Sequence, residues 1–302
     1  MTEPMHHGQL ELSPELAAQL VTQLLPGTDP ATIRLLPSSA TTNTVVRIGE
    51  DLAARFPLQP TDPDAARSAL AAELEAMGEF AAVSPLPAPD PVALAEPSAA
   101  FPMPWSVQTW IPGEVADPLT IAGSDAAADD LAALLLALRA VPTRGRRFRG
   151  PGRGGELTAH EDWVRECLER SRDLLPVGPL ADRWERWRTL PRLSLDVMSH
   201  RDLIPANLLT AEGRVVGVLD AGGYGPADRA LDLVGAWHLL DAARREQLRK
   251  RLGCSDLEWE RGAAWAFVQA IGLVWYYERT NWTMAELGRS TLARLLEDPA
   301  VG

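Results

Sequence analysis

Four polar side chains gather in one short part of the sequence, between residues 199 and 220. His200, Asp202 and Asn207 belong to the segment SHRDLIPANLL, and Asp220 ends the apolar run VVGVLD. A carboxylate can accept the proton of an attacking hydroxyl. A second carboxylate beside an amide oxygen suits Mg²⁺, which prefers hard oxygen ligands and takes one or two carboxylates together with substrate phosphates. The residue types therefore predict a general base next to a magnesium site.

A β-hairpin is predicted to position two of these side chains. The sequence NLLTAEGRVVGVLD has two apolar runs on either side of Glu212 and Gly213, which is typical of a hairpin. If the chain turns after Gly213, Asn207 and Asp220 are directly opposed, with Cβ atoms about 4.5 to 5.5 Å apart. One Mg²⁺ could then bind both and offset the cost of crowding carboxylates there. Asp202 would stay free to act as the base.

The elements that must hold these residues predict an α+β protein with two lobes. Before Pro112 the patterns indicate a small sheet with few helices, and after it they are mostly helical. The elements expected in the first part are a helix from Ser13, a hairpin over 42–57, a helix from Asp62, a proline-rich passage over 84–104 and a strand over 105–111. We expect a small sheet-plus-helix lobe over 1–111 and a larger helical lobe over 112–302.

Two features of the second part carry specific expectations. Thr158 and Glu161 have the spacing of a capping box and are expected to open a helix. The apolar run AAWAFVQAIGLVWYY over 263–277 is shorter than the ~20 residues that a bilayer span needs, so we expect a buried helix rather than a membrane segment.

Composition narrows the class of protein. The 302 residues carry a formal net charge of -12, which argues against nucleic-acid binding because phosphates need a basic surface. Cys167 and Cys254 are isolated, and the first residues lack the pattern of a signal peptide, so we expect reduced thiols in the cytoplasm. Lys250 is the only lysine and has no glycine loop before it, so a lysine-containing phosphate loop is excluded and arginine must grip any nucleotide phosphate.

The motif H-x-D-x-x-x-x-N, followed by a strand that ends in Asp, resembles the catalytic segment of the aminoglycoside phosphotransferase family, relatives of the protein kinases. The likeness covers nearly the whole chain. Further similar segments are ATTNTVVRIGEDLAARFP, PWSVQTWIPGE, GGYGPADRALDL, WERGAAWAF and YYERTN. The resemblance implies a bilobal protein-kinase-like fold, with the nucleotide between the lobes and the acceptor held by the helical lobe. It also implies an enzyme that moves the γ-phosphate of ATP or GTP to a hydroxyl of a small molecule.

The family pattern implies a role for each matching residue of the motif. Asp202 is the catalytic base, His200 supports the catalytic loop, and Asn207 and Asp220 are the magnesium ligands. These roles suit phosphoryl transfer, in which the protein mainly positions groups and neutralises charge.

The resemblance extends to a nucleotide site in the first lobe. Arg55 falls where the family has its phosphate-gripping cation, normally lysine, and arginine can bind phosphate bidentately; Arg47 is the alternative. On the helix from Asp62 onward, Glu73 lies at the margin of the apolar stripe, so we expect it to pair with Arg55. The strand with Gln108 and Trp110 corresponds to the family's hinge, whose backbone would read the purine edge.

The expected acceptor is an antibiotic. An acidic protein would suit a polycationic aminoglycoside, because carboxylates pair with amines. A macrolide, a peptide or nucleoside antibiotic and a small metabolite remain alternatives. So does a different class of protein, a nucleotide-binding regulator without transfer activity.

Several residues of the helical lobe have open roles. Asp228 and Asp232 either support the catalytic loop or are acids at a helix N-terminus. The glycine cluster over 150–155 is interpreted as a loop rather than a phosphate cradle. The candidate acceptor-pocket residues are Trp237, Tyr276, Tyr277 and Asn281.

Overall fold

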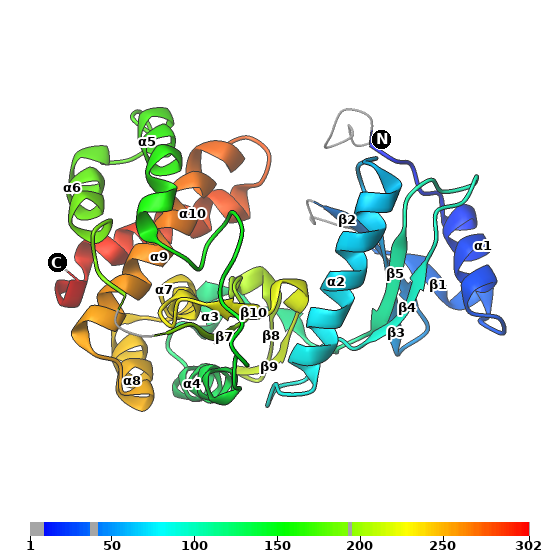
Figure 1. Ribbon diagram of the computed structural model, residues 1–302, viewed down its shortest axis with the longest axis horizontal. Coiled ribbons are helices and arrows are strands. Elements are labelled where there is room, and N and C mark those ends of the chain that lie inside the picture. The colour runs from blue at the N-terminus through cyan, green and yellow to red at the C-terminus, as the bar shows by residue number, and fades with distance from the viewer. Residues whose placement is uncertain (1–8, 37–41, 193–194, 302) are drawn as a thin grey trace. The chain divides into compact units, whose positions relative to one another are not determined.

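The computed structural model describes residues 9–36, 42–192 and 195–301, and the chain forms two compact units (Figure 1). The first unit comprises residues 1–82, 88–112 and 220–222, and the second comprises 83–87, 113–219 and 223–302. A single boundary at Pro112 would place Asp220 in the second unit. The structure instead groups Asp220 and its two following residues with the first unit.

An antiparallel five-stranded sheet is the centre of the first unit. Its strands, in spatial order, are β1 (Ile33–Leu35), β2 (Asn43–Ile48), β3 (Leu52–Pro57), β5 (Trp105–Thr109) and β4 (Pro91–Ala95). β2 and β3 form the predicted hairpin, with Ile48 opposite Leu52. The proline-rich passage does not predict β4. Pro91 is tolerated because β4 is an edge strand, where one row of backbone groups needs no partner.

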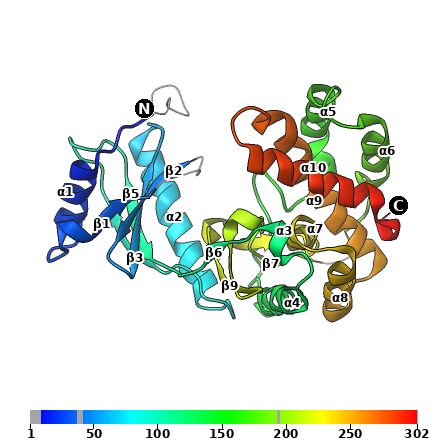
Figure 2. The same cartoon turned by 180° about the vertical axis from the view of Figure 1, so that it is seen from behind.

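Two helices flank this sheet on opposite sides, as both views show (Figures 1 and 2). α1 (Pro14–Leu24) begins after Ser13, whose hydroxyl accepts the backbone N–H of Leu16 at 3.1 Å. α2 (Pro63–Ala81) begins after Asp62, which caps its first turn in the same way. Both helix starts are as predicted. The core between α1 and the sheet contains Phe56 stacked on Trp105, with ring centroids 4.4 Å apart.

The second unit is mostly helical. Its helices are α3 (Pro118–Ile121), α4 (Asp125–Ala140), α5 (Glu161–Arg170), α6 (Val177–Trp187), α7 (Val234–Leu239), α8 (Ala242–Leu252), α9 (Asp256–Tyr277) and α10 (Trp282–Glu297). α9 contains the long apolar run and is buried along most of its length, as predicted. Among the residues that the structure describes, none of the helices combines the length and apolarity that a bilayer crossing requires.

Short strands complete the second unit. β6 (Glu114–Val115), β8 (Leu208–Ala211) and β9 (Arg214–Val218) form one sheet, and β7 (Val197–Ser199) pairs with β10 (Gly225–Ala227). The predicted capping box is wrong. Thr158 lies inside a 3₁₀ turn that precedes α5, whereas an N-cap residue needs an extended backbone. The α+β class, with a sheet-based unit and a helical unit, is confirmed.

Candidate active site

Asp232 holds the loop that follows β7. Its Oδ2 accepts the backbone N–H of His200 at 2.8 Å, and its Oδ1 accepts that of Arg201 at 2.9 Å. The carboxylate belongs to a residue only 5% exposed, so these are charge-assisted bonds inside the protein. Arg201 has a φ of 75°, a conformation that is uncommon for residues other than glycine and that the surrounding bonds must stabilise. Asp232 is thus a support of the loop, which settles one of the open roles.

His200 links this loop to the end of β9. Its buried ring places Nε2 2.9 Å from the carbonyl oxygen of Leu219, and its Nδ1 accepts the backbone N–H of Asp202 at 3.3 Å. Because Nδ1 accepts, Nε2 carries the proton and donates. His200 therefore occupies a supporting position and holds Asp202 through its backbone.

The carboxylate of Asp202 has three hydrogen-bond donors. Arg153 Nη2 and Gln269 Nε2 both donate to Oδ1 at 2.8 Å, and Asn207 Nδ2 donates to Oδ2 at 3.2 Å. Each carboxylate oxygen can accept about two hydrogen bonds. Oδ1 is therefore filled, and Oδ2 has one position open. The sequence led us to expect that Asp202 would be free of partners, and this expectation is wrong. One of its oxygens can still accept a proton.

A glycine-rich loop brings Arg153 to Asp202. Gly154 has a φ of 127°, and a Cβ on it would lie 2.8 Å from the Phe148 ring, so only glycine fits. The carbonyl of Gly154 accepts the backbone N–H of Asp228 at 2.7 Å, which fixes the loop. The cluster over 150–155 is thus a positioning loop for a cation. The sequence offers only a weak signal for it, an arginine inside a run of glycines.

The amide of Asn207 is oriented by Asp202. Its nitrogen donates to the Asp202 carbonyl oxygen at 2.9 Å as well as to Oδ2, and its Oδ1 accepts no hydrogen bond from the residues that the structure describes. An amide oxygen left over in this way is a suitable ligand for a hard cation. Within the described ranges, no three or more His, Cys, Asp or Glu side chains are gathered as metal ligands, but one amide and one carboxylate with substrate phosphates would not need such a group.

The hairpin register differs from the prediction by one residue. The backbone carbonyl of Asn207 accepts the N–H of Leu219, not of Asp220, at 2.8 Å. The reason lies in the turn, where Glu212 and Gly213 both have left-handed backbones, with φ of 50° and 74°, and form a two-residue connection. This turn alone would shift the pairing by two residues, and a bulge after Leu209 takes back one of them. Asp220 therefore lies beyond the paired residues of β8 and β9.

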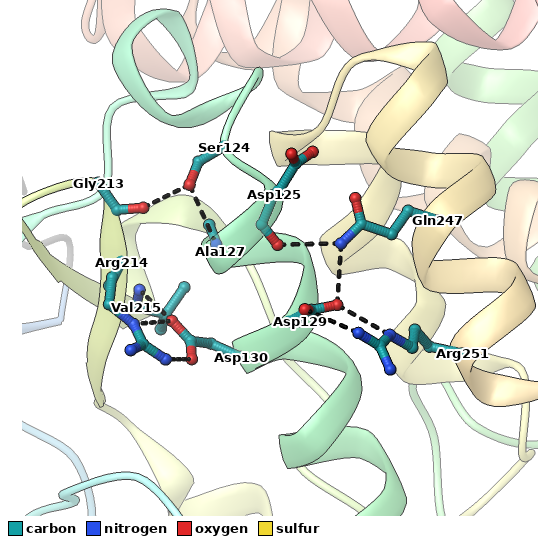
Figure 3. A network of polar contacts seen from close by, with 10 residues as sticks. All are labelled: Ser124, Asp125, Ala127, Asp129, Asp130, Gly213, Arg214, Val215, Gln247 and Arg251. Atoms are coloured by element: carbon teal, nitrogen blue, oxygen red, sulfur yellow. Dashed lines mark hydrogen bonds and ion pairs between the residues drawn. The ribbon is translucent and has the colours of Figure 1, made fainter.

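Helices of the second unit fix this hairpin (Figure 3). Asp130 on α4 accepts the backbone N–H of Val215 and the Nε of Arg214, each at 3.1 Å. Ser124, the N-cap of α4, donates its hydroxyl to the carbonyl of Gly213. α4 is in turn tied to α8, beside which it lies in Figures 1 and 2. The strand that follows Asn207 is thus anchored at its far end.

Arg55, Asp220 and Glu73 form a charged cluster in the first unit. Arg55 points away from the core formed by its neighbours on β3, and its Nη1 donates to Asp220 Oδ1 at 2.9 Å. The Asp220 segment packs on α2, since a Cβ on Gly222 would lie 3.2 Å from that of Glu73. The predicted Arg55–Glu73 ion pair is therefore replaced by an Arg55–Asp220 pair.

The pKa of Glu73 still depends on both of its charged neighbours, Arg55 and Asp220. Although its side chain is exposed at the surface, desolvation by the surrounding protein raises the pKa of its carboxyl. The charge of Arg55 lowers that pKa, and the charge of Asp220 raises it. One guanidinium faces two carboxylates here, so a further cation would be electrostatically favourable.

Arg47 has other partners and is a weaker candidate for phosphate binding. Its Nε donates to the carbonyl of Gly49 at 2.9 Å, and its guanidinium lies 4.0 Å from the ring centroid of Trp110. These contacts commit the side chain to the β2–β3 turn and to that ring.

The backbone of the predicted hinge is partly occupied. Gln108 lies on β5 between two strands, opposite Ala53 on one side and Pro91 on the other. The N–H of Trp110 donates to Asp51 at 2.7 Å. Ile111 is the next residue, and its N–H and C=O have no hydrogen-bond partner within the described part of the chain. The N–H of Trp110 is therefore not available to bind a purine, whereas both backbone groups of Ile111 are.

The remaining candidates are mostly structural. Trp237 is fully buried and belongs to the core of the second unit. Asn281 caps α10 by accepting the N–H of Met284, whereas Tyr276 is 57% exposed. Asp228 is buried and accepts from Nε of Arg261 and from Nε1 of Trp265, both at 3.0 Å. It belongs to an ion pair in the core rather than to the loop that follows β7.

Comparisons with known proteins bear on the family and the fold. Residues 32–269 match the family model described as the phosphotransferase enzyme family. An aminoglycoside 3'-phosphotransferase of Escherichia coli is 39% identical over 77 residues, which are 24% of this chain and only 28% of that protein.

Solved structures share the fold over nearly the full length. An aminoglycoside 2'-phosphotransferase-IIIa, determined as its GDP complex, is similar with a TM-score of 0.67 and 16% identity, covering 94% of this chain and 99% of its own. A macrolide 2'-phosphotransferase from Brachybacterium faecium is similar with a TM-score of 0.61 and 20% identity, covering 95% and 99%. These likenesses confirm the predicted kinase-like fold.

Proposed function

Since this chain belongs to the phosphotransferase enzyme family, we propose that it transfers the γ-phosphate of ATP or GTP to a hydroxyl of a small molecule. The observation that carries the proposal is the geometry of Asp202, with Oδ1 filled by two donors and one acceptor position open on Oδ2. A carboxylate held in this way can take the proton of a hydroxyl without first being reoriented.

In the transfer step, the acceptor oxygen forms a bond to the γ-phosphorus and gives its proton to Asp202 Oδ2. The bond between that phosphorus and the β–γ bridging oxygen breaks, and the nucleoside diphosphate leaves with the electron pair. His200 and Asp232 hold the loop that carries the base, through the hydrogen bonds described above. The protein contributes position and charge rather than a covalent intermediate.

We assign nucleotide binding to residues 1–111 and acceptor binding to residues 112–302. Arg55 would grip a phosphate, and Glu73 would hold Arg55 in place once Asp220 has another partner. Asn207 Oδ1 and the Asp220 carboxylate would hold Mg²⁺, which when bound neutralises charge on the phosphates.

The purine would be read by the segment that follows β5. Ile111 has both backbone groups available, and Gln108 and Trp110 would flank it. Backbone groups can serve either purine, so the proposal includes ATP and GTP.

We further propose that the acceptor is an antibiotic and that the enzyme acts in the cytoplasm. Relatives in sequence and fold are named for aminoglycosides and macrolides. A net charge of -12 suits a polycationic aminoglycoside, because carboxylates pair with ammonium groups. Macrolides, peptide and nucleoside antibiotics and small metabolites are the other acceptors to test.

The test is a screen for nucleotide consumption with ATP and GTP against these acceptor classes, with detection of the added phosphate by mass. Asp202→Asn should lower kcat about 10²- to 10⁴-fold, because a general base is lost while the side-chain shape is kept. Asp162→Asn, which changes a carboxylate whose side chain is 94% exposed, is the matched control and should leave kcat unchanged. Full turnover by the Asp202 variant would refute the assignment, and nucleotide binding without transfer would indicate a regulatory protein.

A further inference from the structure

We propose that a buried chain of three hydrogen-bonding side chains, Gln269, His238 and Thr291, is a positioning device for the catalytic base Asp202. The inference rests on the proposed function, in which Asp202 Oδ2 takes the hydroxyl proton. It concerns only the second unit, where all four residues lie.

Consecutive hydrogen bonds connect Thr291 in the core to Asp202. Thr291 Oγ1 on α10 lies 2.8 Å from His238 Nδ1 on α7, and His238 Nε2 lies 3.3 Å from Gln269 Oε1 on α9. Gln269 Nε2 then donates to Asp202 Oδ1 at 2.8 Å. Thr291 and His238 are 0% exposed and Gln269 is 8% exposed, so the chain lies in the protein interior up to the point where it meets Asp202.

Only one direction of donation is consistent with these contacts. Gln269 must turn its nitrogen to Asp202, because its oxygen would otherwise face a carboxylate oxygen at contact distance. Its oxygen then faces His238 and requires a proton on Nε2. With Nε2 protonated and the ring neutral, Nδ1 must accept, and the hydroxyl of Thr291 is the donor that it meets. The carboxylate of Asp202 thus determines the tautomer of His238, and the hydroxyl of Thr291 holds the ring by donating to Nδ1.

Stability alone does not account for three polar side chains in this core. Burying polar groups costs free energy that their hydrogen bonds at best offset, so apolar residues of similar volume would serve packing equally well. The chain ends on Asp202, whose Oδ2 keeps an open acceptor position, and this supplies the reason. Together with Arg153, Gln269 fills Oδ1 and prevents rotation of the carboxylate, which keeps Oδ2 directed at the acceptor.

The experiment uses a matched pair of substitutions at Thr291 in the full-length protein. Thr291→Val keeps the volume and removes the hydroxyl, whereas Thr291→Ser keeps the hydroxyl and removes a methyl group. We expect Thr291→Val to lower kcat about 3- to 10-fold with KM values for nucleotide and acceptor unchanged, and Thr291→Ser to retain the wild-type kcat. A packing role predicts the opposite order, because serine leaves the larger gap, and that order would overturn the inference.

Gln269→Met provides a second variant that acts closer to the base. It removes the donor to Asp202 at nearly constant volume, so kcat should fall about 10- to 100-fold, again without a change in KM. Thermal unfolding of each variant shows whether it is folded under the assay conditions. An unchanged kcat in folded Gln269→Met would refute a positioning role.

A measurement without turnover separates this inference from the proposed function. The ¹⁵N chemical shifts of the His238 ring in the labelled protein should show the neutral Nε2–H tautomer, and Thr291→Val should shift the Nδ1 resonance by removing its hydrogen-bond donor while Thr291→Ser should not. If the wild-type protein transferred phosphate to no acceptor, the proposed function would be refuted. The ¹⁵N measurement would still test the hydrogen-bonded chain, because it does not require turnover. A ring protonated on Nδ1 would defeat the chain itself.

Discussion

Mild acid should destabilise the protein through His238, and the size of the effect follows from its burial. The ring is fully buried, and desolvation lowers its pKa from 6.5 to about 4, with the nearby charges of Arg153 and Arg294 acting in the same direction and the hydrogen bond to Gln269 opposing them. In the unfolded chain the same ring titrates near 6.5. Between these two values the unfolded chain binds a proton that the folded chain does not.

The sign and magnitude follow from linkage. Where the unfolded state binds more protons, the free energy of unfolding rises with pH. The contribution of neutral His238 is therefore complete above pH 6.5 and is lost as the pH falls from 6.5 toward 4. A difference of about 2.5 pKa units corresponds to a loss of about 3 kcal/mol across this window.

The assay compares urea unfolding of the wild type and of His238→Gln at several pH values within this window. Glutamine cannot become charged, and its amide can still donate toward Gln269. Carboxylates and the other histidines titrate in both proteins, so the difference between the two pH profiles isolates this ring. The wild type should lose about 3 kcal/mol more than the variant. Parallel profiles would show that His238 can be protonated in the folded protein at little cost, which would refute the reasoning.

Three further substitutions test other parts of the structure. Gly154→Ala should displace the loop and withdraw Arg153 from Asp202, the proposed base, so kcat should fall about 10-fold with nucleotide affinity intact; wild-type kcat would show that Arg153 has no part in turnover. Arg261→Leu should lower the free energy of unfolding by about 3 to 5 kcal/mol in a urea titration, because Asp228 would be buried without its cation, and a change below about 1 kcal/mol would contradict this. Ile111→Pro should weaken nucleotide binding about 10-fold by calorimetry through loss of one N–H donor, and unchanged affinity would exclude that backbone as the purine reader.

Features set by neighbouring residues could be predicted from the sequence. Ser13 and Asp62 each precede a proline and cap the helices that begin there, because these side chains accept the N–H groups that a helix start leaves unpaired. The β2–β3 hairpin could also be predicted, because its two strands and its turn are contiguous in the sequence. The contact of Asn207 with Asp202 is also local, five residues apart in one loop, but it was not predicted, because Asp202 was expected to stay free.

Features set by distant residues could not be predicted. Arg153 and Gln269 reach Asp202 from 49 and 67 positions away along the chain, and no local pattern connects them. The hairpin register failed for a different reason. The predicted turn was centred one position too late, and a bulge that apolar alternation does not reveal offset half of the resulting shift.

Gln269 shows where a distant contact still leaves a trace in the sequence. It is the one polar residue in the run AAWAFVQAIGLVWYY, and every residue from Gly262 to Gly272 on α9 is buried. A polar side chain in such a helix must find a partner or cost free energy, so its presence alone implies a buried polar contact. The identity of that partner requires the fold, which brings His238 on α7 to one end of the amide and Asp202 to the other. A lone polar residue in an apolar helix is therefore a pointer to a site even when the sequence cannot say which one.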